Sequence, residues 1–210
     1  MSSKTLFLAL ALAARVAAAE LAIDASTPPA PPVPLAFAAG GTSPSGHVLA
    51  ANSRYLTLDG QPWFPVMGEF HYSRYPAAEW ETELLKMKAG GITVVSTYVF
   101  WIHHEETEGK FDWSGQRDLR RFVEVCAKHG LYAWVRIGPW DHGEARNGGF
   151  PDWLLKLGPT RTNEPAYLER VKVFYGEIGR QLKGLFWKDG GPIAGVQIEN
   201  EYHPGRGGVE

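Results

Sequence analysis

Residues 190–202 read G-G-P-I-A-G-V-Q-I-E-N-E-Y, and three more short apolar runs followed by polar residues precede them in the chain. Residues 193–198 form a short apolar run between Gly-Pro and polar residues, which predicts a buried β-strand. Glu199, Asn200 and Glu201 follow at the end of this run. Because strand residues alternate between faces, we expect the two glutamates on one face and Asn200 on the other, unless the chain bends there.

The two glutamates stand where a buried strand leaves the core. Such a position is unfavourable for a carboxylate unless the charge is paired or used in chemistry. A carboxyl group in this setting can have a raised pKa and act as a general acid. The same residues also suit a turn or a helix N-cap that opens the next element, and this stretch alone fits both interpretations.

Three more apolar runs and three helical patterns precede this stretch. The chain begins its regular part with a predicted hairpin at residues 55–64. The apolar runs predict strands at residues 65–70, 92–101 and 131–137, and the periodic segments predict helices at residues 76–89, 118–128 and 165–186. Strands that are continuous apolar runs and alternate with helices indicate a parallel sheet that is buried on both faces.

Polar residues follow every predicted strand, at residues 71–74, 103–106, 141–144 and 199–201. Functional residues gather at the carboxyl ends of parallel strands in barrels and in open α/β sheets. No Gly-x-Gly-x-x-Gly follows the first strand, which weighs against a dinucleotide-binding fold. These signals predict an α/β fold with a parallel sheet, and its four β/α units are half of a (β/α)8 barrel of the TIM-barrel type.

The composition and the N-terminal segment bear on the partners and location of the protein. The 210 residues have a net charge of −2, which indicates no polyanion partner such as a nucleic acid. Residues 1–19 have the charged start, the short apolar run and the small residues of a signal peptide, so we predict a secreted or periplasmic protein without a membrane span. Residues 20–53, rich in Pro, Ala and Gly, predict a linker without a core, followed by the catalytic domain at residues 54–210.

Six motifs in order give the sequence a specific resemblance. The chain from about residue 54 to residue 202 resembles glycoside hydrolase family 35, the β-galactosidase family. The motifs are G-E-F-H-Y-S-R (68–74), T-Y-V-F-W (97–101), H-E (104–105) with G-K-F-D-W-S-G (109–115), R-I-G-P (136–139), G-G-F-P-D-W-L (148–154) and Q-I-E-N-E-Y (197–202). The resemblance implies a (β/α)8 barrel and retaining hydrolysis of terminal β-D-galactosides, with no metal and no other cofactor.

The resemblance also assigns roles to four residues. The proton donor of the family corresponds to Glu201, and Asn200 corresponds to the residue that contacts the sugar 2-hydroxyl. Tyr98 and Glu144 correspond to further sugar-contacting residues. A retaining enzyme needs a second carboxylate about 5 Å from the acid. The family places this nucleophile after its seventh strand, so we expect the present chain to be an N-terminal fragment that is inactive alone.

Several residues depart from the usual pattern of the family and bear on the preferred sugar. They are Ile102, Glu106, Trp140, Asp141, His142, Gly143, Ala145 and Arg146. Two alternative functions stay open: a non-catalytic half-barrel that binds glycans, and a related retaining barrel glycosidase that acts on another sugar. The cluster of His103, His104, Glu105 and Glu106 suggests a metal site, but it lacks the His-Glu-x-x-His spacing, so we predict no metal.

Overall fold

The computed structural model describes residues 24, 26, 28–37 and 39–203. The predicted signal peptide, residues 1–19, lies outside the described residues. The chain divides into two units, residues 1–31 and residues 32–210. The described residues of the first unit are exposed, and all helices and strands described below belong to the second unit.

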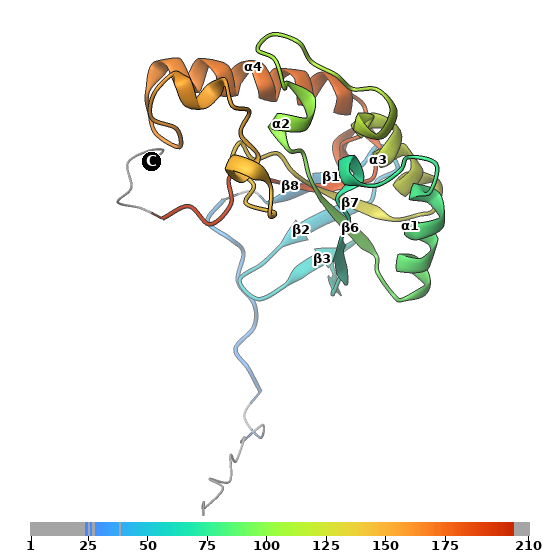
Figure 1. Ribbon diagram of the computed structural model, residues 1–210. Helices are drawn as coiled ribbons and strands as arrows, with labels where there is room; N and C mark the ends of the chain where they lie inside the picture. Colours follow the sequence, from blue (N-terminus) through green and yellow to red (C-terminus); the bar gives the residue numbers. More distant parts are fainter. Residues whose placement is uncertain (1–23, 25, 27, 38, 204–210) are drawn as a thin grey trace, which may run out of the picture. The chain divides into compact units, whose positions relative to one another are not determined.

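Four parallel strands form the sheet that positions the candidate site (Figure 1). They are β5 (Met67–Glu69), β6 (Val94–Tyr98), β7 (Tyr132–Arg136) and β8 (Ile193–Gln197), and they neighbour one another in this order. Each pair is parallel, as the predicted crossover helices require. The four strands expected from the apolar runs are therefore confirmed, with each strand shorter than the run that predicted it.

The three predicted crossover helices are present as α1 (Trp80–Ala89), α3 (Leu119–Lys128) and α4 (Pro165–Leu182). The Asp118 side chain caps α3 by accepting a hydrogen bond from the Arg121 backbone N–H at 2.9 Å. Helix α3 packs against both α1 and α4. The apolar faces of these helices and the strands enclose one core, in which Trp80, Phe122 and Phe174 are fully buried.

Short helical turns fill the connections at the carboxyl side of the strands and elsewhere. They are α2 (Trp101–His104), η1 (Tyr72–Arg74), η2 (Gly115–Arg117), η3 (Arg146–Gly149), η4 (Leu154–Lys156) and η5 (Trp187–Asp189). Helix α2 corrects the prediction that a strand continues to residue 101. Strand β6 ends at Tyr98, and the backbone turns so that Trp101 enters the core, where its ring stacks on Phe174 at 4.5 Å.

An antiparallel sheet corrects the prediction of a coreless linker over residues 20–53. Strands β1 (Gly40–Thr42) and β2 (Val48–Ala51) pair with the predicted hairpin, which is formed by β3 (Leu56–Leu58) and β4 (Gln61–Trp63). The hairpin offers a free edge to β2, so a stretch rich in Ala, Gly and Pro becomes ordered by backbone hydrogen bonds rather than by a core of its own. Residues 28–34 are all exposed.

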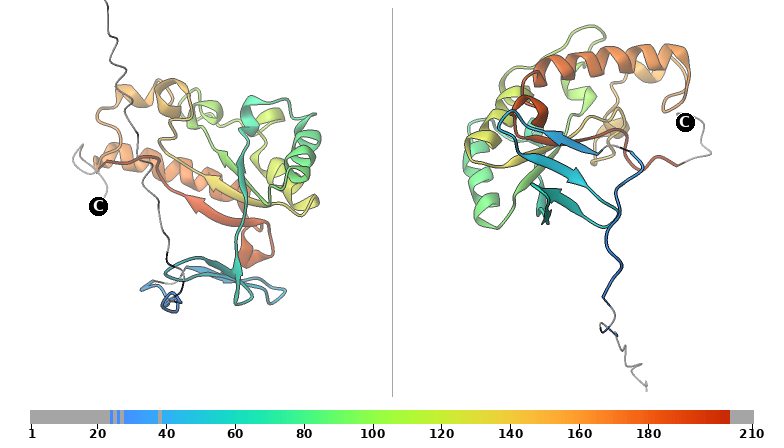
Figure 2. Two further views of the ribbon diagram at one scale, coloured as in Figure 1. Left: turned by 90° about the horizontal axis from the view of Figure 1, so that it is seen from below. Right: turned by 180° about the vertical axis from the view of Figure 1, so that it is seen from behind.

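The antiparallel sheet lies at the amino ends of the parallel strands (Figure 2). Residues of both sheets line an apolar cavity of about 160 Å³, among them Leu49 and Trp63 on one side and Val94 and Trp134 on the other. The Trp63 ring meets the Tyr132 ring edge-on at 5.3 Å. The carboxyl ends of the strands stay uncovered by this sheet. No helix among the described residues has the length and apolar content needed to cross a bilayer.

Candidate active site

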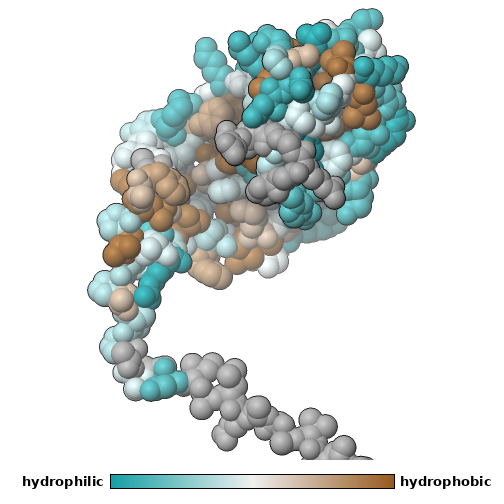
Figure 3. Space-filling view, turned by 90° about the vertical axis from the view of Figure 1, so that its left-hand side faces the viewer, coloured by the Kyte–Doolittle hydropathy of each residue, from teal (hydrophilic) through white to brown (hydrophobic). Residues whose placement is uncertain are grey.

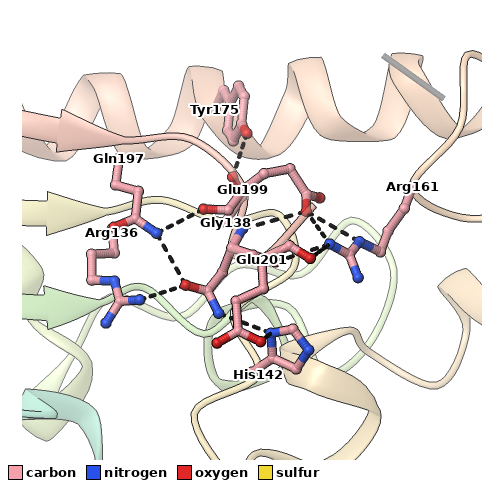
Figure 4. A network of polar contacts seen from close by, with 9 residues as sticks. Arg136, Gly138, His142, Arg161, Tyr175, Gln197, Glu199 and Glu201 are labelled. Atoms are coloured by element: carbon pink, nitrogen blue, oxygen red, sulfur yellow. Dashed lines mark hydrogen bonds and ion pairs between the residues drawn. The ribbon is translucent and has the colours of Figure 1, made fainter. Parts of the chain in front are cut away.

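The chain bends immediately after β8, and the bend separates the three polar residues that follow it. Glu199 and Glu201 have left-handed backbone conformations, with φ of 60° and 47°. A left-handed residue breaks the alternation of a strand, so the three side chains do not simply alternate between two faces. Instead, Glu199 forms an ion pair with Arg161 at 2.7 Å (Figure 4). Asn200 forms hydrogen bonds with Arg136 at the end of β7 and with His142 in the loop after β7.

The side chain of Asn200 is held by three partners. Its Oδ1 accepts hydrogen bonds from Arg136 Nη2 at 2.6 Å and from Gln197 Nε2 at 3.1 Å. Its Nδ2 lies 2.8 Å from Nδ1 of His142. Arg136 ends β7 and Gln197 ends β8, while His142 belongs to the loop after β7. The amide of Asn200 is thus fixed from three sides at the carboxyl end of the sheet.

Arg136 connects Asn200 to the first two strands of the sheet. Its Nη1 donates a 2.6 Å hydrogen bond to Glu69 Oε2 on β5, and its guanidinium lies over the Tyr98 ring, with Cζ 3.7 Å from the ring centroid. Tyr98 ends β6 and is only 5% exposed. Burial raises the pKa of Tyr98 to about 12, so its hydroxyl stays protonated at neutral pH. One cation therefore ties together residues from all four strand ends.

The loop that carries Glu144 lies on the Tyr98 side of the site. His142, Gly143 and Glu144 all have positive φ, of 56°, 47° and 50°. A Cβ at Gly143 would come within 2.8 Å of the Phe100 ring and 3.2 Å of Tyr98 Cδ2, so only glycine lets the loop approach these rings so closely. The side chain of Glu144 is exposed and forms no hydrogen bond or ion pair with any residue that the structure describes.

Glu201 projects toward a recess beside this cluster. Its side chain is 71% exposed, and its Oε2 lies 3.9 Å from Nδ1 of His142. A cavity of about 500 Å³ is lined by Trp140, His142, Thr160, Arg161, Glu201, Tyr202 and His203. Arg161 braces the bend, because its Nη2 donates to the backbone carbonyls of Asn200 at 2.9 Å and Glu201 at 3.4 Å. The carboxyl group of Glu201 therefore faces open space next to the fixed amide of Asn200.

A second, buried carboxyl group lies near the cluster. Asp141 is 1% exposed, and neither of its oxygens has a hydrogen-bond partner among the described residues. Burial raises the pKa of Asp141 well above its usual value, although the nearby charge of Arg136 acts in the opposite direction. Burial thus favours the uncharged form of the Asp141 carboxyl group beside the cluster.

The histidines of α2 have structural partners. The imidazole of His104 donates from Nδ1 to the Asp112 carbonyl at 3.1 Å, so its Nε2 accepts from the Tyr72 hydroxyl at 2.6 Å. Burial lowers the pKa of His104 to about 3, which keeps the ring neutral. Glu105 accepts hydrogen bonds from Trp101 and Gly109, both at 2.7 Å. No group of three or more potential metal-binding side chains is found among the described residues.

The structure joins three of the four residues predicted for the site into one cluster. It links Tyr98 and Asn200 through Arg136 and brings Glu201 next to them through His142, while Glu144 has no hydrogen bond or ion pair with the residues that the structure describes. Sequence reasoning missed the roles of Arg136, His142 and Arg161. An arginine at the end of a buried strand was a usable signal for Arg136, but nothing in the sequence marked Arg161, which precedes α4 in an irregular segment.

Comparison with known proteins gives this arrangement a family context. The sequence model for glycosyl hydrolases family 35 matches residues 55–208. The β-galactosidase of Bos taurus is 40% identical over 152 residues, which cover 71% of this chain and 23% of that protein. The β-galactosidase of Xanthomonas manihotis is 36% identical over 167 residues, which cover 79% of this chain and 28% of that protein. The chain thus spans about a quarter of the length of these curated relatives.

Solved structures agree on the fold class. The endo-1,4-β-mannanase from Rhizomucor miehei superposes with a TM-score of 0.55 at 17% identity, covering 83% of this chain and 52% of that one. The β-galactosidase from Marinomonas ef1 superposes with a TM-score of 0.52 at 17% identity, covering 66% of this chain and 22% of that one. Both are TIM-barrel glycosidases, so the predicted α/β class of TIM-barrel type is confirmed at that level.

Proposed function

The chain belongs to glycosyl hydrolase family 35, and from this membership we propose that it forms the acid/base side of the active site of a retaining β-galactosidase. The four parallel strands and three crossover helices are, in this proposal, the first four units of a (β/α)8 barrel. Their carboxyl ends carry the polar cluster around Arg136, which is where barrels of this type hold their substrates.

Glu201 is the proton donor in this proposal. Cleavage of a glycosidic bond needs a proton on the leaving oxygen and an attack on the anomeric carbon by a second carboxylate. Glu201 has the exposure to reach a substrate in the adjoining cavity, which is about 500 Å³ in volume. The nucleophile is assigned to a later strand outside these 210 residues. The chain alone then holds one of the two carboxylates that the reaction needs.

The observation that carries the proposal is the fixed amide of Asn200 beside Glu201. Arg136 and Gln197 occupy Oδ1 of Asn200, and His142 occupies one of the two Nδ2 hydrogens. One N–H therefore remains to donate to a sugar hydroxyl. A 2-hydroxyl held next to the acid is what a retaining glycosidase uses to stabilise its transition state. Tyr98 and Glu144 are proposed to contact other hydroxyls of the same sugar.

The partner in this proposal is a carbohydrate with a terminal β-D-galactosyl residue. The departures at Ile102, Glu106 and residues 140–146 lie at or near the proposed sugar pocket, so they bear on the sugar that is preferred. A secreted or periplasmic location is proposed from residues 1–19 alone. Fractionation of the source cells with an antibody against the chain tests this location, and a cytosolic pool alone would contradict it.

Nitrophenyl glycosides test the activity directly. We expect the full-length protein to cleave the β-galactoside and the 210-residue chain to leave it intact. Proton donation alone contributes about 10²–10⁴-fold, against roughly 10⁶-fold or more for whole enzymes. Cleavage of another β-glycoside but not of the galactoside by the full-length protein would contradict the substrate assignment. A full-length protein that binds galactosides without cleaving any glycoside would indicate a glycan-binding protein instead.

A further inference from the structure

The hydrogen bonds around Asn200 fix the tautomer of His142. A guanidinium only donates hydrogen bonds, so the atom of Asn200 that faces Arg136 at 2.6 Å is the carbonyl oxygen. The amide nitrogen must then face His142, and an amide N–H also only donates. His142 Nδ1 is therefore the acceptor of this 2.8 Å hydrogen bond, and the single ring proton of the neutral imidazole is on Nε2.

Protonation of His142 is incompatible with this arrangement. In the imidazolium form both ring nitrogens are donors, so Nδ1 would confront the N–H of Asn200 with another N–H. Asn200 has no favourable way to turn over, because its amide group would then meet the donors of Arg136 and Gln197. A different acceptor is close by, since Glu201 Oε2 lies 3.9 Å from the same ring nitrogen. The protonated ring therefore gains a partner in Glu201 and loses the one in Asn200.

We propose that His142 is a positioning residue that acts through Asn200 and Glu201. In the neutral state it holds the Asn200 amide so that the remaining N–H points to the sugar 2-hydroxyl. In the protonated state it releases Asn200 and pairs with Glu201, which removes two groups from their places in the reaction. This inference rests on the proposed function.

The charged and titratable groups around His142 come from three segments. Asp141 and Glu144 flank it on its own loop, and burial raises the pKa of Asp141. Glu201 and His203 follow β8 and line the same cavity as His142. Arg161 reaches this cavity from the segment before α4, where its charge is already paired with Glu199 at 2.7 Å. Among these groups Glu201 is the acceptor that the structure places nearest to Nδ1.

Two substitutions separate the positioning role from a structural one. His142→Asn can keep an acceptor near the place of Nδ1 but cannot take up a proton, whereas His142→Ala removes the acceptor. In the full-length enzyme we expect His142→Ala to lower kcat/KM for a β-galactoside about tenfold, as expected for one hydrogen bond. The loss should be absent for the matching 2-deoxygalactoside, which has no 2-hydroxyl for Asn200 to bind. His47→Ala, at an exposed histidine paired with Asp59, is the matched control.

The pH profile gives the second readout. We expect His142→Asn to restore kcat/KM at neutral pH and to extend activity to lower pH than the parent enzyme. An equal loss for both substrates in His142→Ala, or an unchanged acid limb in His142→Asn, would overturn the proposal.

A third readout does not depend on catalysis. The ring ¹⁵N shifts of His142 in the labelled protein should report a proton on Nε2 and none on Nδ1 at pH 8, and the side-chain amide signals of Asn200 should shift as His142 titrates. A proton on Nδ1 at pH 8 would overturn the proposal even if the enzyme is a β-galactosidase. A full-length protein without glycosidase activity but with the Nε2 tautomer would instead count against the proposed function.

Discussion

The guanidinium of Arg136 lies 2.6 Å from Oδ1 of Asn200 and joins the end of β7 to the residue before the proposed proton donor. The same side chain donates to Glu69 at 2.6 Å and covers the Tyr98 ring. An arginine can do this because its planar fork offers several donors at fixed angles, which the single ammonium of lysine does not. Arg136 therefore links Glu69, Tyr98 and Asn200 into one cluster.

Replacing Arg136 by lysine tests this dependence. We expect Arg136→Lys to lose the contact with Asn200 or with Glu69, which costs about 1–3 kcal/mol of unfolding free energy. It should also lower kcat/KM of the full-length enzyme by at least about tenfold. Urea unfolding followed by tryptophan fluorescence and steady-state assays measure the two effects. Arg180→Lys, at an exposed ion pair with Glu177, is the control and should change stability by less than about 0.5 kcal/mol. Equal effects of the two substitutions would contradict the role of Arg136.

Glu69 should make the stability of the protein fall in acid. Burial alone would raise its pKa, but the hydrogen bond from His71 and the charge of Arg136 outweigh burial, so the pKa of Glu69 lies below the usual 4.5. A carboxyl group with a lowered folded-state pKa contributes stability above its unfolded pKa, and this is lost as the pH falls through the folded pKa. We expect Glu69→Gln to cost roughly 1 kcal/mol at pH 7 and much less near pH 3. Urea unfolding at both pH values measures this loss of stability, and Glu169→Gln on the exposed surface of α4 is the control. A loss of stability in Glu69→Gln that is the same at pH 3 as at pH 7 would contradict the prediction.

Asp141 should have the opposite pH dependence. Its carboxyl group is neutral when buried but ionises in the unfolded chain above its usual pKa of 3.8, which favours unfolding as the pH rises. Asp141→Asn cannot ionise, so we expect it to raise the unfolding free energy by at least about 1 kcal/mol at pH 7 and to have little effect at pH 3.5. Asp152→Asn removes an exposed partner of Arg146 and serves as the control. A loss of stability at pH 7 in Asp141→Asn would show that the carboxyl group is ionised and paired.

The edges of the parallel sheet should make the isolated chain self-associate. Within the described residues β5 and β8 each pair with one strand of the parallel sheet, and apolar side chains at these edges are exposed, among them Met67 and Ile198, the latter by 67%. Figure 3 shows apolar surface among hydrophilic residues on one face of the molecule. We expect the 210-residue chain to bind a hydrophobic dye and to sediment as oligomers. Met67→Lys with Ile198→Lys should reduce both effects. A monomer that melts cooperatively without binding the dye would favour the glycan-binding alternative.

Much of the fold could be predicted because its signals are local. Apolar runs bounded by Gly and Pro gave the four parallel strands, and helical stripes gave α1, α3 and α4. Strands β1 and β2 escaped prediction because their order comes from pairing, of β2 with β3 and of β1 with β2. Amino-acid composition does not reveal that β3 has a free edge. The turn between β6 and α2 was not predicted because residues 99–101 are as apolar and as buried as the strand before them.

The site was predictable only as a set of strand ends. The sequence places Asn200 and Glu201 after a strand, but the left-handed φ at Glu199 and Glu201 decides where each side chain goes. That conformation is braced by Arg161, which lies 38 residues away from Glu199 in the sequence. The contact between Asn200 and His142 likewise joins two loops, 58 residues apart, whose meeting depends on the sheet register. No short-range pattern encodes either contact.

The leaving-group dependence of a Glu201 variant tests the central proposal most directly. A general acid matters most when the leaving oxygen is basic and least when the leaving group departs without a proton. In the full-length enzyme we predict that Glu201→Ala lowers kcat/KM by about 10²–10⁴-fold for methyl β-galactoside or lactose, whose leaving groups are basic. The kcat/KM for a dinitrophenyl β-galactoside should fall much less. Added azide should accelerate turnover of the dinitrophenyl substrate and give β-galactosyl azide, because the vacant acid position admits a small nucleophile on the retained face. An equal loss for both substrates, with no azide product, would contradict the assignment of Glu201 as the acid.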